Sequence, residues 1–251
     1  MCQKRAFVQM NYNYPTWSCN DQTEAIGKSE FWKLGITESC RNMETDYWNG
    51  YYSECGDKLI RQVPSQFAAF VLGELSEAEQ IVEFGCGLGR DSFFFNGFGF
   101  DVVGVDGSEA AVVQCRTRAN GRPGISFLNR DVSDAALVSE ISGLRKSGVS
   151  LMLYARFFLH AIDETSQEAF LMMASDVCKP KDRMALEFRT DHDKDGVRET
   201  ATHYRRYIKM EELITAASQH GFRDVYSVEG RGFAKYKSDD AVVARVILEK
   251  T

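Results

Sequence analysis

Short hydrophobic runs alternate with helix-length amphipathic segments through the middle of the chain. The runs are rich in Val, Ile, Leu and Phe, as in strands that are buried on both faces of a parallel sheet. They predict strands at residues 80–84, 101–105, 125–129, 149–155 and 183–189. The segments between them predict helices at residues 89–97, 108–118, 133–145 and 164–178. Strands separated by helices imply a parallel sheet with right-handed crossovers and helices on both faces.

The pattern changes towards the C-terminus. A helix is expected at residues 209–220, and Gly221 suits the position just after its end. Residues 224–233 and 241–249 are both strand-like, and only a short polar turn joins them. No crossover helix fits there, so the two strands should form an antiparallel pair at the sheet edge. The predicted fold class is therefore α/β, a Rossmann-like sheet of seven strands, mostly parallel, with a C-terminal antiparallel pair.

The first part of the chain shows no such periodicity. Residues 1–45 are expected to be an N-terminal extension, serving as a lid or as a dimer contact, and residues 46–251 to be the main domain. A helix is predicted at residues 65–75, after a Pro64 that suits a helix start. Four aromatic residues precede it and should either cover a bound ligand or pack against this helix: Tyr47, Trp48, Tyr51 and Tyr52.

The most informative segment is residues 81–92, Ile-Val-Glu-Phe-Gly-Cys-Gly-Leu-Gly-Arg-Asp-Ser. A hydrophobic strand enters a loop that carries Gly85, Gly87 and Gly89. Glycine lets a ligand approach the backbone, and the helix that follows presents free N–H groups and the positive end of its dipole. Asp106 ends the next strand, where a carboxylate can accept two hydrogen bonds from a ribose diol. The segment predicts a nucleotide-cofactor site.

The residues around the glycines indicate which cofactor this is. Dinucleotide sites favour G-x-G-x-x-G, but Arg90 stands in the sixth place of the frame that starts at Gly85. The loop instead has Glu83 leading the glycine triplet. This arrangement resembles motif I of the class I S-adenosylmethionine-dependent methyltransferases. The resemblance implies S-adenosyl-L-methionine as cofactor and S-adenosyl-L-homocysteine as product.

The resemblance also implies the residues that bind the cofactor. In that family an acid after the third strand accepts from the adenine amino group and the next residue packs near the ring, which matches Asp131 and Val132. Capping of the following helix is the alternative role for Asp131. The full set of expected cofactor-binding residues is Glu83, Gly85, Cys86, Gly87, Gly89, Arg90, Asp106, Gly107, Ser108, Asp131, Val132, Tyr154, Trp48 and Tyr52.

Composition and charge limit the classes of partner and the location that we expect. The 251 residues are 44% hydrophobic and 26% charged, which suits one sizeable α/β domain. No hydrophobic run approaches the roughly 18 residues of a membrane helix, and the first residues lack the hydrophobic run of a signal peptide. The seven cysteines form no C-x-x-C pair, so we expect reduced thiols, no metal site and a cytoplasmic location. A net charge of −6 argues against a nucleic-acid partner.

Cations and a histidine follow the fourth and fifth strands. Arg156 and Arg189 stand where these strands leave the sheet, and His160 follows four residues after Arg156. Since ligands bind at the carboxyl ends of such strands and guanidinium groups bind carboxylate or phosphate, we expect a small anionic substrate. The expected substrate-binding residues are Arg156, His160, Arg189, Tyr204, Arg206 and Lys235, with His160 and Arg156 as the catalytic pair. Structural ion pairs for the arginines and a core position for His160 are the alternatives.

Four segments on this side of the sheet resemble a bacterial subgroup of class I enzymes found with surface-polysaccharide and phosphonate pathways. They are residues 154–160, 187–190, 203–207 and 232–236. Some members of the subgroup resemble phosphate or phosphonate O-methyltransferases. The resemblance implies in-line O-methylation of a small phosphate, phosphonate or carboxylate metabolite, or of a nucleotide-linked intermediate. The end of the fourth strand departs from the Asn-Pro-Pro-Tyr signature of enzymes that methylate amino groups in DNA and protein.

The acceptor decides whether a base is needed. An anionic oxygen needs none, and Arg156 would then hold oxygens that do not react, whereas a hydroxyl or an amine would need His160 as base. Three other functions stay open: an N-methyltransferase of a small amine, a non-catalytic S-adenosylmethionine-binding module and a nicotinamide dehydrogenase. A homodimer is also left open as the state of assembly.

Overall fold

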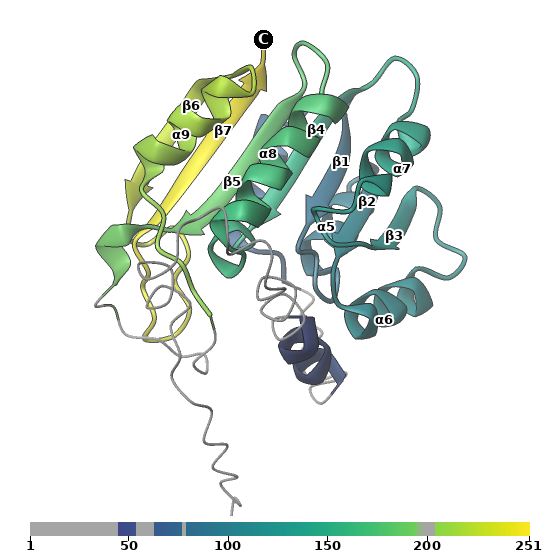
Figure 1. Ribbon diagram of the computed structural model, residues 1–251. Helices are drawn as coiled ribbons and strands as arrows, with labels where there is room; N and C mark the ends of the chain where they lie inside the picture. The colour runs from purple at the N-terminus through teal and green to yellow at the C-terminus, as the bar shows by residue number, and fades with distance from the viewer. Residues whose placement is uncertain (1–44, 54–62, 77–78, 195, 197–203) are drawn as a thin grey trace, which may run out of the picture. The chain divides into compact units, whose positions relative to one another are not determined.

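The computed structural model describes residues 45–53, 63–76, 79–194, 196 and 204–251, all of which belong to one compact unit. The expected N-terminal extension, residues 1–45, lies almost wholly outside the described residues. A seven-stranded sheet with the order β3-β2-β1-β4-β5-β7-β6 forms the centre of the unit (Figure 1). Its strands are β1 (Glu79–Phe84), β2 (Asp101–Asp106), β3 (Ile125–Asn129), β4 (Ser150–Arg156), β5 (Arg183–Arg189), β6 (Phe222–Gly230) and β7 (Val243–Lys250).

Strand directions agree with the predicted fold class. The neighbours from β3 through β5 pair in parallel, whereas β7 runs antiparallel to both β5 and β6. The chain order reverses direction at β1, where β2 and β4 lie on either side. In open α/β sheets, ligands bind outside the carboxyl ends of the strands at such a switch point. The fold therefore places the glycine loop after β1 at the position where a ligand is expected.

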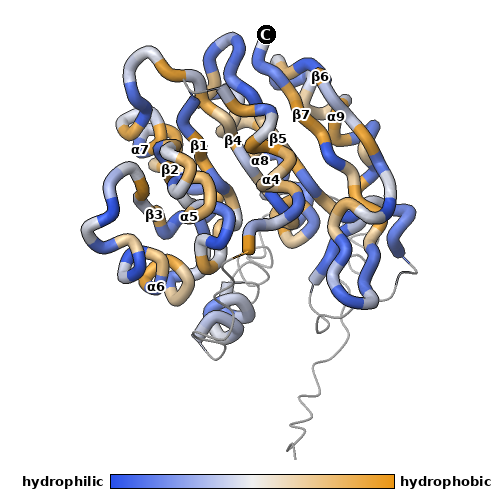
Figure 2. Tube along the Cα trace, turned by 180° about the vertical axis from the view of Figure 1, so that it is seen from behind, coloured by the Kyte–Doolittle hydropathy of each residue, from blue (hydrophilic) through white to orange (hydrophobic). Residues whose placement is uncertain are grey.

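Helices cover both faces of the sheet. The helices of the described part are α4 (Gln66–Glu74), α5 (Arg90–Gly97), α6 (Glu109–Ala119), α7 (Ala136–Leu144), α8 (Glu164–Val177) and α9 (Met210–Gln219), with 3-10 turns η2 (Leu159–Ala161) and η3 (Asp191–Asp193). α7, α8 and α9 pack on one face and α4 and α5 on the other, each over its own hydrophobic cluster (Figure 1). Figure 2 shows hydrophobic positions along strands such as β7 and polar ones at the connecting loops.

Local sequence signals set several of the helix ends. The side chains of Ser65, Ser108 and Asp163 accept hydrogen bonds from the first turns of α4, α6 and α8, as N-cap residues do. Gly221 has a φ of 78° directly after the cap of α9, as expected from the sequence. α7 is shorter than predicted, because residues 131–134 form a separate turn before it begins.

The connection from β6 to β7 is longer than predicted. β6 ends at Gly230, and residues 231–242 form a loop in which Tyr236 and Asp239 bridge a turn. Lys237 takes a left-handed φ of 56° in this turn, which interrupts the extended backbone. This loop and η3 lie beside the end of β5, where they border the carboxyl edge. Within the described ranges, no helix is both long enough and hydrophobic enough to cross a membrane.

Candidate active site

The glycine loop takes a backbone conformation that suits close approach of a ligand. Gly85, Gly87 and Gly89 have φ values of 66°, 51° and 70°, in the left-handed region. A Cβ added at Gly87 would lie 2.6 Å from the hydroxyl oxygen of Tyr52, so a side chain does not fit there. α5 begins directly after the loop and directs its free N–H groups to this edge. The loop thus has the form that the sequence predicts.

Asp106 at the end of β2 faces the loop. Its two carboxylate oxygens accept hydrogen bonds from the backbone N–H groups of Gly87 at 2.7 Å and Ser108 at 2.8 Å. Burial raises the pKa of Asp106, and these two hydrogen bonds oppose the rise. Each oxygen keeps a second acceptor position, which is what a pair of ribose hydroxyl groups requires. The geometry fits the expected role of Asp106.

Residues 45–53 are helical and dock beside the loop. Asn49 Oδ1 accepts from Ser108 Oγ at 2.8 Å, and the carbonyl of Tyr52 accepts from the side chain of Gln114 at 3.0 Å. The ring of Trp48 stacks on that of Tyr52 with centroids 5.9 Å apart. Burial and the nearby Asp106 raise the pKa of Tyr52 well above its usual value, so the phenol stays neutral. The roles of Trp48 and Tyr52 toward the cofactor remain predictions.

Two residues of the motif support the loop from below. Glu83 is buried and accepts a short hydrogen bond from the Ser92 hydroxyl. Burial and the neighbouring Asp91 raise the pKa of Glu83 well above its usual value, which favours the protonated acid. Cys86 is buried as well, and its hydrogen bond with Cys115, together with burial, raises the pKa of the thiol. Contact of Glu83 and Cys86 with the cofactor stays a prediction.

The turn after β3 shows the capping role considered for Asp131, and its role toward the adenine amino group stays a prediction. Its side chain is exposed, and Oδ1 accepts from the backbone N–H of Ser133 at 2.8 Å and from the Ser133 hydroxyl at 2.5 Å. It therefore caps this turn, while its other oxygen has no hydrogen bond within the described part of the chain. Val132 is buried in the core cluster beside α7. Gly107 lies between Asp106 and Ser108, and its carbonyl accepts from Asn129 at 3.0 Å.

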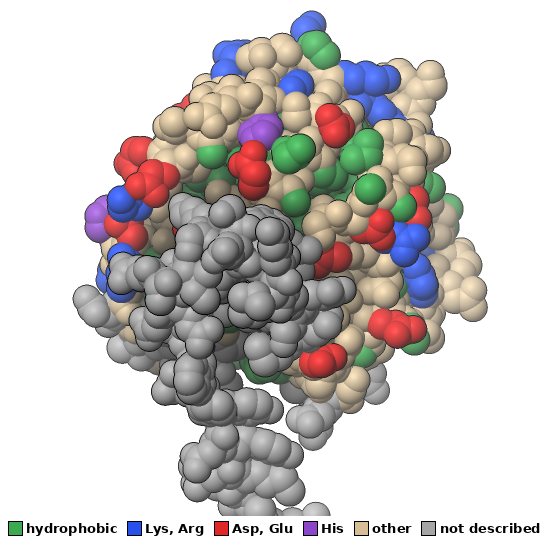
Figure 3. Space-filling model, viewed as in Figure 1, with side chains coloured by type: hydrophobic (Ala, Val, Ile, Leu, Met, Phe, Trp, Pro, Cys, Tyr) green, Lys and Arg blue, Asp and Glu red, His purple; other side chains and the backbone are tan. Residues whose placement is uncertain are grey.

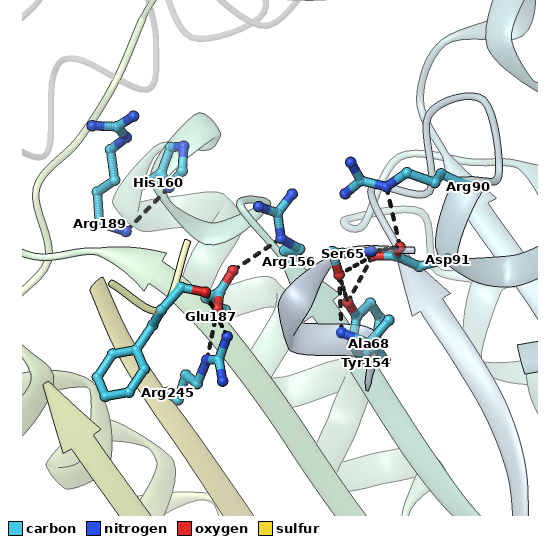
Figure 4. Close-up of polar contacts among 11 residues, drawn as sticks. Ser65, Ala68, Arg90, Asp91, Tyr154, Arg156, His160, Glu187, Arg189 and Arg245 are labelled. Atoms are coloured by element: carbon cyan, nitrogen blue, oxygen red, sulfur yellow. Dashed lines mark hydrogen bonds and ion pairs between the residues drawn. The ribbon is translucent and has the colours of Figure 1, made fainter. Parts of the chain in front are cut away.

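A buried network under the loop was not expected from the sequence. Asp91 accepts from the Ser65 backbone N–H at 2.8 Å, the Ser65 hydroxyl at 2.6 Å and the Tyr154 hydroxyl at 2.8 Å (Figure 4). Burial alone would raise the pKa of Asp91, but Arg90 and the Ser65 hydrogen bonds more than offset it, so the pKa is lowered. Tyr154 is fully buried and belongs to this network, so its side chain lies below the loop. The signal for Asp91 in the sequence was its position two residues after Gly89.

Arg156 belongs to a row of charges across three strands. Its Nε donates to Glu187 at 2.9 Å, and Arg245 Nε donates to the other Glu187 oxygen at 2.8 Å (Figure 4). The three residues lie opposite one another in register on β4, β5 and β7. Burial raises the pKa of Glu187, and the two arginines oppose that rise. The ion pair with Glu187 is the structural alternative that the sequence left open for Arg156.

Phe157 contacts both Arg156 and His160 after β4, and the sequence did not predict it as a site residue. It has a φ of 56°, unusual for a residue with a bulky side chain. Its backbone N–H donates to the Glu187 carbonyl at 2.8 Å. Its ring lies 4.2 Å from the guanidinium carbon of Arg156 and 5.0 Å from the His160 ring. Backbone strain of this kind concentrates at functional sites.

Arg189 is held by two carboxylates. Nη1 donates to Asp193 and Nη2 to Asp239, both at 2.5 Å, and the residue is only 6% exposed. The side chain therefore ties η3 and the 231–242 loop to the end of β5. Its positive charge is already neutralised, so the observed contacts are those of a structural ion pair. A contact of Arg189 with the substrate remains a prediction.

His160 lies in η2, close to the segment that carries Arg206. The His160 ring is buried, and its Nδ1 accepts from the backbone N–H of Arg189 at 3.3 Å. Arg206 Nη2 donates to Gln167 Oε1 at 2.6 Å and to the Leu159 carbonyl at 3.3 Å. Burial lowers the pKa of Arg206. The remaining expected substrate residues, Tyr204 and Lys235, are exposed.

The sequence of the central region identifies the domain. Residues 81–181 match the family model described as a methyltransferase domain. The chain carries a methyltransferase domain. The matched region runs from β1 to the turn before β5 and so contains the glycine loop, Asp106, Asp131, Arg156 and His160. No curated protein matches the chain.

Solved structures share the fold. A S-adenosylmethionine-dependent methyltransferase from Anabaena variabilis is similar with a TM-score of 0.62 and 17% identity over 82% of this chain and 95% of that one. The 1,6-didemethyltoxoflavin N1-methyltransferase of Burkholderia thailandensis, solved with S-adenosylhomocysteine, has a TM-score of 0.61 and 17% identity. The match covers 86% of this chain and 90% of that one. The glycopeptide N-methyltransferase MtfA, complexed with S-adenosylmethionine, has a TM-score of 0.58 and 13% identity, and the match covers 75% of this chain and 95% of that one. At these identities the likeness establishes the fold.

The methyltransferase domain and its acid-led glycine loop give S-adenosylmethionine as the cofactor. The residues present fit this molecule. Gly87 has no Cβ, the Tyr52 hydroxyl lies close to where one would stand, and Asp106 offers two acceptor oxygens beside the loop. When bound, the cofactor supplies an activated methyl group, so the protein contributes position and electrostatics. The enzyme is a methyltransferase, as the sequence predicts.

Proposed function

We propose that this methyltransferase O-methylates a small anionic metabolite that carries a phosphate, phosphonate or carboxylate group. The acceptor would lie over the ends of β4 and β5, next to His160 and Phe157. Lys235 and Tyr204 are exposed cationic and phenolic side chains on the connections that follow β5 and β6. Acidic and basic side chains are interspersed over the surface that Figure 3 shows, which suits a small substrate better than a polyanion.

The observation that carries this proposal is the hydrogen bond at His160 Nδ1. A backbone N–H can only donate, so the bond from Arg189 makes Nδ1 the acceptor. The neutral ring then carries its proton on Nε2. A ring in this tautomer donates through Nε2, and its basic nitrogen, Nδ1, is engaged by the backbone. Such a histidine suits an oxygen that is already anionic and needs no base, because it can bind and orient that oxygen.

A panel of acceptors tests the proposal. The wild-type enzyme is incubated with S-adenosylmethionine and with matched carboxylates, phosphonates, phosphate monoesters, alcohols and amines, and formation of S-adenosylhomocysteine is measured together with the methylated product. We expect turnover with one anionic class. For a carboxylate acceptor, kcat/KM should stay flat between about pH 6 and 9, since the acceptor is ionised throughout. Turnover of amines alone would overturn the proposal.

Variants of His160 separate a donor from a base. Glutamine keeps an N–H donor at the end of its side chain, so H160Q should lose less than about tenfold in kcat/KM if His160 donates a hydrogen bond. A general base contributes about 10²- to 10⁴-fold, and H160Q would then lose that much. His220, which pairs with Glu168 of α8, provides the matched control as H220Q. A loss of 10²-fold or more in H160Q alone would contradict the donor role.

N-methylation of a small amine is a second candidate. It is favoured by the ion pairs at Arg189, where Asp193 and Asp239 face one guanidinium group. Within the described part of the chain, this cluster has two carboxylates for one guanidinium group, and Asp239 Oδ1 has no hydrogen-bond partner there. A cationic amine would be attracted there. The acceptor panel decides between the two candidates, because amines and carboxylates are tested side by side.

A further inference from the structure

Arg90 and Arg156 lie on the carboxyl side of two neighbouring strands, β1 and β4. Arg90 is the first residue of α5, directly after the glycine loop that follows β1, and Arg156 is the last residue of β4. β1 and β4 pair in parallel, with Phe84 opposite Ala155. In Figure 4 the guanidinium group of Arg90 extends toward the side on which Arg156 lies, and the terminal nitrogens of Arg156 point away from the end of β4; both arginines lower the pKa of Asp91 through their charge. Two positive charges therefore converge beside the glycine loop.

Among the described residues, each of these arginines donates to a protein acceptor through its Nε. Arg90 Nε donates to Asp91 Oδ1 at 3.2 Å and Arg156 Nε donates to Glu187 Oε1 at 2.9 Å. Across the described parts of the chain, the Nη1 and Nη2 groups of both residues donate to no protein acceptor. Their side chains are 30% and 19% exposed, so a ligand can reach them. Four N–H₂ groups are thus left to a ligand or to water.

The two guanidinium groups are held in place from behind. Asp91 is itself fixed by Ser65 and Tyr154, and Glu187 by Arg245. The guanidinium carbon of Arg156 also lies 4.2 Å from the centre of the Phe157 ring. Side chains positioned in this way lose little conformational entropy when they bind an anion. The contacts at Nε orient the arginines and leave their terminal nitrogens open.

The local charge is short of one anion. Arg90, Arg156 and Arg245 form ion pairs with two carboxyl groups, those of Asp91 and Glu187. Burial and the neighbouring Asp91 raise the pKa of Glu83, the other acid nearby, well above its usual value, which favours its uncharged form. The N-terminal end of α5 adds a positive dipole end at the same place. One further carboxylate would balance this cluster.

The order of the strands indicates which carboxylate this is. Asp106 on β2 marks the ribose position, and the glycine loop on β1 lies between it and β4. A cofactor that extends from β2 across β1 brings its amino-acid end to Arg90 and Arg156. We propose that these two arginines together bind the carboxylate of the methionine moiety of S-adenosylmethionine. The proposal rests on the assignment of this cofactor and not on the nature of the acceptor.

This proposal changes the role of Arg156. The sequence placed it with the substrate, whereas its position next to Arg90 and the glycine loop makes it a cofactor-binding residue. Glu187 and Arg245 then become positioning residues, because they orient Arg156 from behind. The acceptor would be recognised by the residues after β4 and β5 without Arg156.

Binding of three ligands tests the proposal without any acceptor. S-adenosylhomocysteine has the carboxylate, decarboxylated S-adenosylmethionine keeps the amine but lacks the carboxylate, and 5′-methylthioadenosine lacks the whole amino-acid end. Calorimetry measures the Kd of each for wild type, R90Q and R156Q. The control is R223Q, because Arg223 is an exposed residue of the edge strand β6 and pairs with Glu249. Thermal unfolding of each variant shows that it is folded at the temperature of the measurement.

The expected result is a selective loss. Both R90Q and R156Q should raise the Kd of S-adenosylhomocysteine by roughly 10- to 100-fold, since each removes charge-assisted hydrogen bonds. The Kd values of 5′-methylthioadenosine and of decarboxylated S-adenosylmethionine should change by less than about threefold, as for substitutions away from the ligand. Equal losses for all three ligands, or no loss for S-adenosylhomocysteine, would overturn the proposal. If R156Q does not fold, R156K replaces it in the test. Lysine keeps the positive charge but cannot bind a carboxylate through two N–H groups as a guanidinium group does, so its Kd should be intermediate.

The outcome is separable from that of the proposed function. An enzyme that turned over amines instead of anions would leave these cofactor affinities unchanged. Conversely, cofactor binding independent of Arg90 and Arg156 would return Arg156 to the acceptor without affecting the acceptor panel.

Discussion

The hydroxyl of Tyr154 donates a hydrogen bond of 2.8 Å to Asp91 Oδ2 and so joins the end of β4 to the first turn of α5. Ser65, the N-cap residue of α4, donates to the same carboxylate. Three elements that are distant in the sequence therefore meet at one buried group beneath the glycine loop. The position of the loop depends on this contact as well as on the backbone of the loop itself.

Tyr154→Phe should lower the stability of the protein. The change removes one buried donor and leaves Asp91 with fewer partners, which costs about 1 to 3 kcal/mol in the free energy of unfolding. Urea denaturation followed by circular dichroism measures this loss. Tyr226→Phe is the control, because Tyr226 is 39% exposed and its change should stay within about 0.5 kcal/mol. Equal stability of the two variants would contradict the role of the hydroxyl.

Glu83→Gln should become more stable relative to wild type as the pH rises. Burial and Asp91 raise the pKa of Glu83 in the folded protein. Such a group favours folding fully below its unfolded pKa of about 4.3, and this contribution is lost as the pH rises through the folded pKa. Glutamine does not titrate. Urea denaturation of both proteins from about pH 4.5 to 8 gives the difference in free energy of unfolding, and a difference independent of pH would argue against the raised pKa.

Gly87→Ala should impair cofactor binding. The left-handed φ of 51° costs an alanine about 1 to 2 kcal/mol, and the new Cβ would lie 2.6 Å from the Tyr52 hydroxyl. We expect a weaker Kd for S-adenosylhomocysteine by calorimetry. Adding Tyr52→Phe removes the hydroxyl and should recover part of the loss, but not the part due to φ. Gly143→Ala in α7 is the control, since a Cβ there meets nothing within 4 Å.

Asp106→Ala should abolish measurable binding of S-adenosylhomocysteine while the fold stays intact. Two hydrogen bonds from a ribose diol to a charged acceptor contribute about 1.5 to 3 kcal/mol each, so affinity should fall by at least about 100-fold. Calorimetry measures the affinity and circular dichroism the fold. Asp101→Ala, at the opposite end of the same strand, should bind normally. Unchanged affinity in Asp106→Ala would refute the ribose assignment.

Arg189→Ala should raise the KM of the acceptor far more than the Kd of S-adenosylhomocysteine. Its guanidinium group ties η3 and the 231–242 loop to β5, so its loss should loosen the wall on the acceptor side. It also removes the cationic partner of the buried Asp193 and Asp239, which costs about 3 to 5 kcal/mol of stability. Kinetics and calorimetry are therefore measured below the melting temperature of the variant. Equal effects on KM and Kd would exclude a role on the acceptor side.

The sequence by itself determined the fold class and the cofactor. Hydrophobic runs of strand length and amphipathic segments of helix length follow local periodicity, so β3 and β5 have the predicted bounds and most other elements differ by one or two residues. The glycine loop could also be predicted, because its backbone conformation depends on residues next to one another in the chain. Gly85, Gly87 and Gly89 all take positive φ.

Only the tertiary structure decided what each charged side chain contacts. Arg156 and Arg189 look alike in sequence, each at the end of a strand. Asp193 and Asp239 enclose Arg189, whereas the terminal nitrogens of Arg156 meet no acceptor in the described ranges of the chain. The partners come from residues as far as 50 positions away. Pairing between distant residues depends on strand order and loop paths, and neither is encoded in local periodicity. The sequence thus identifies the methyl donor, while the assignment of the arginines depends on the three-dimensional arrangement of the strands.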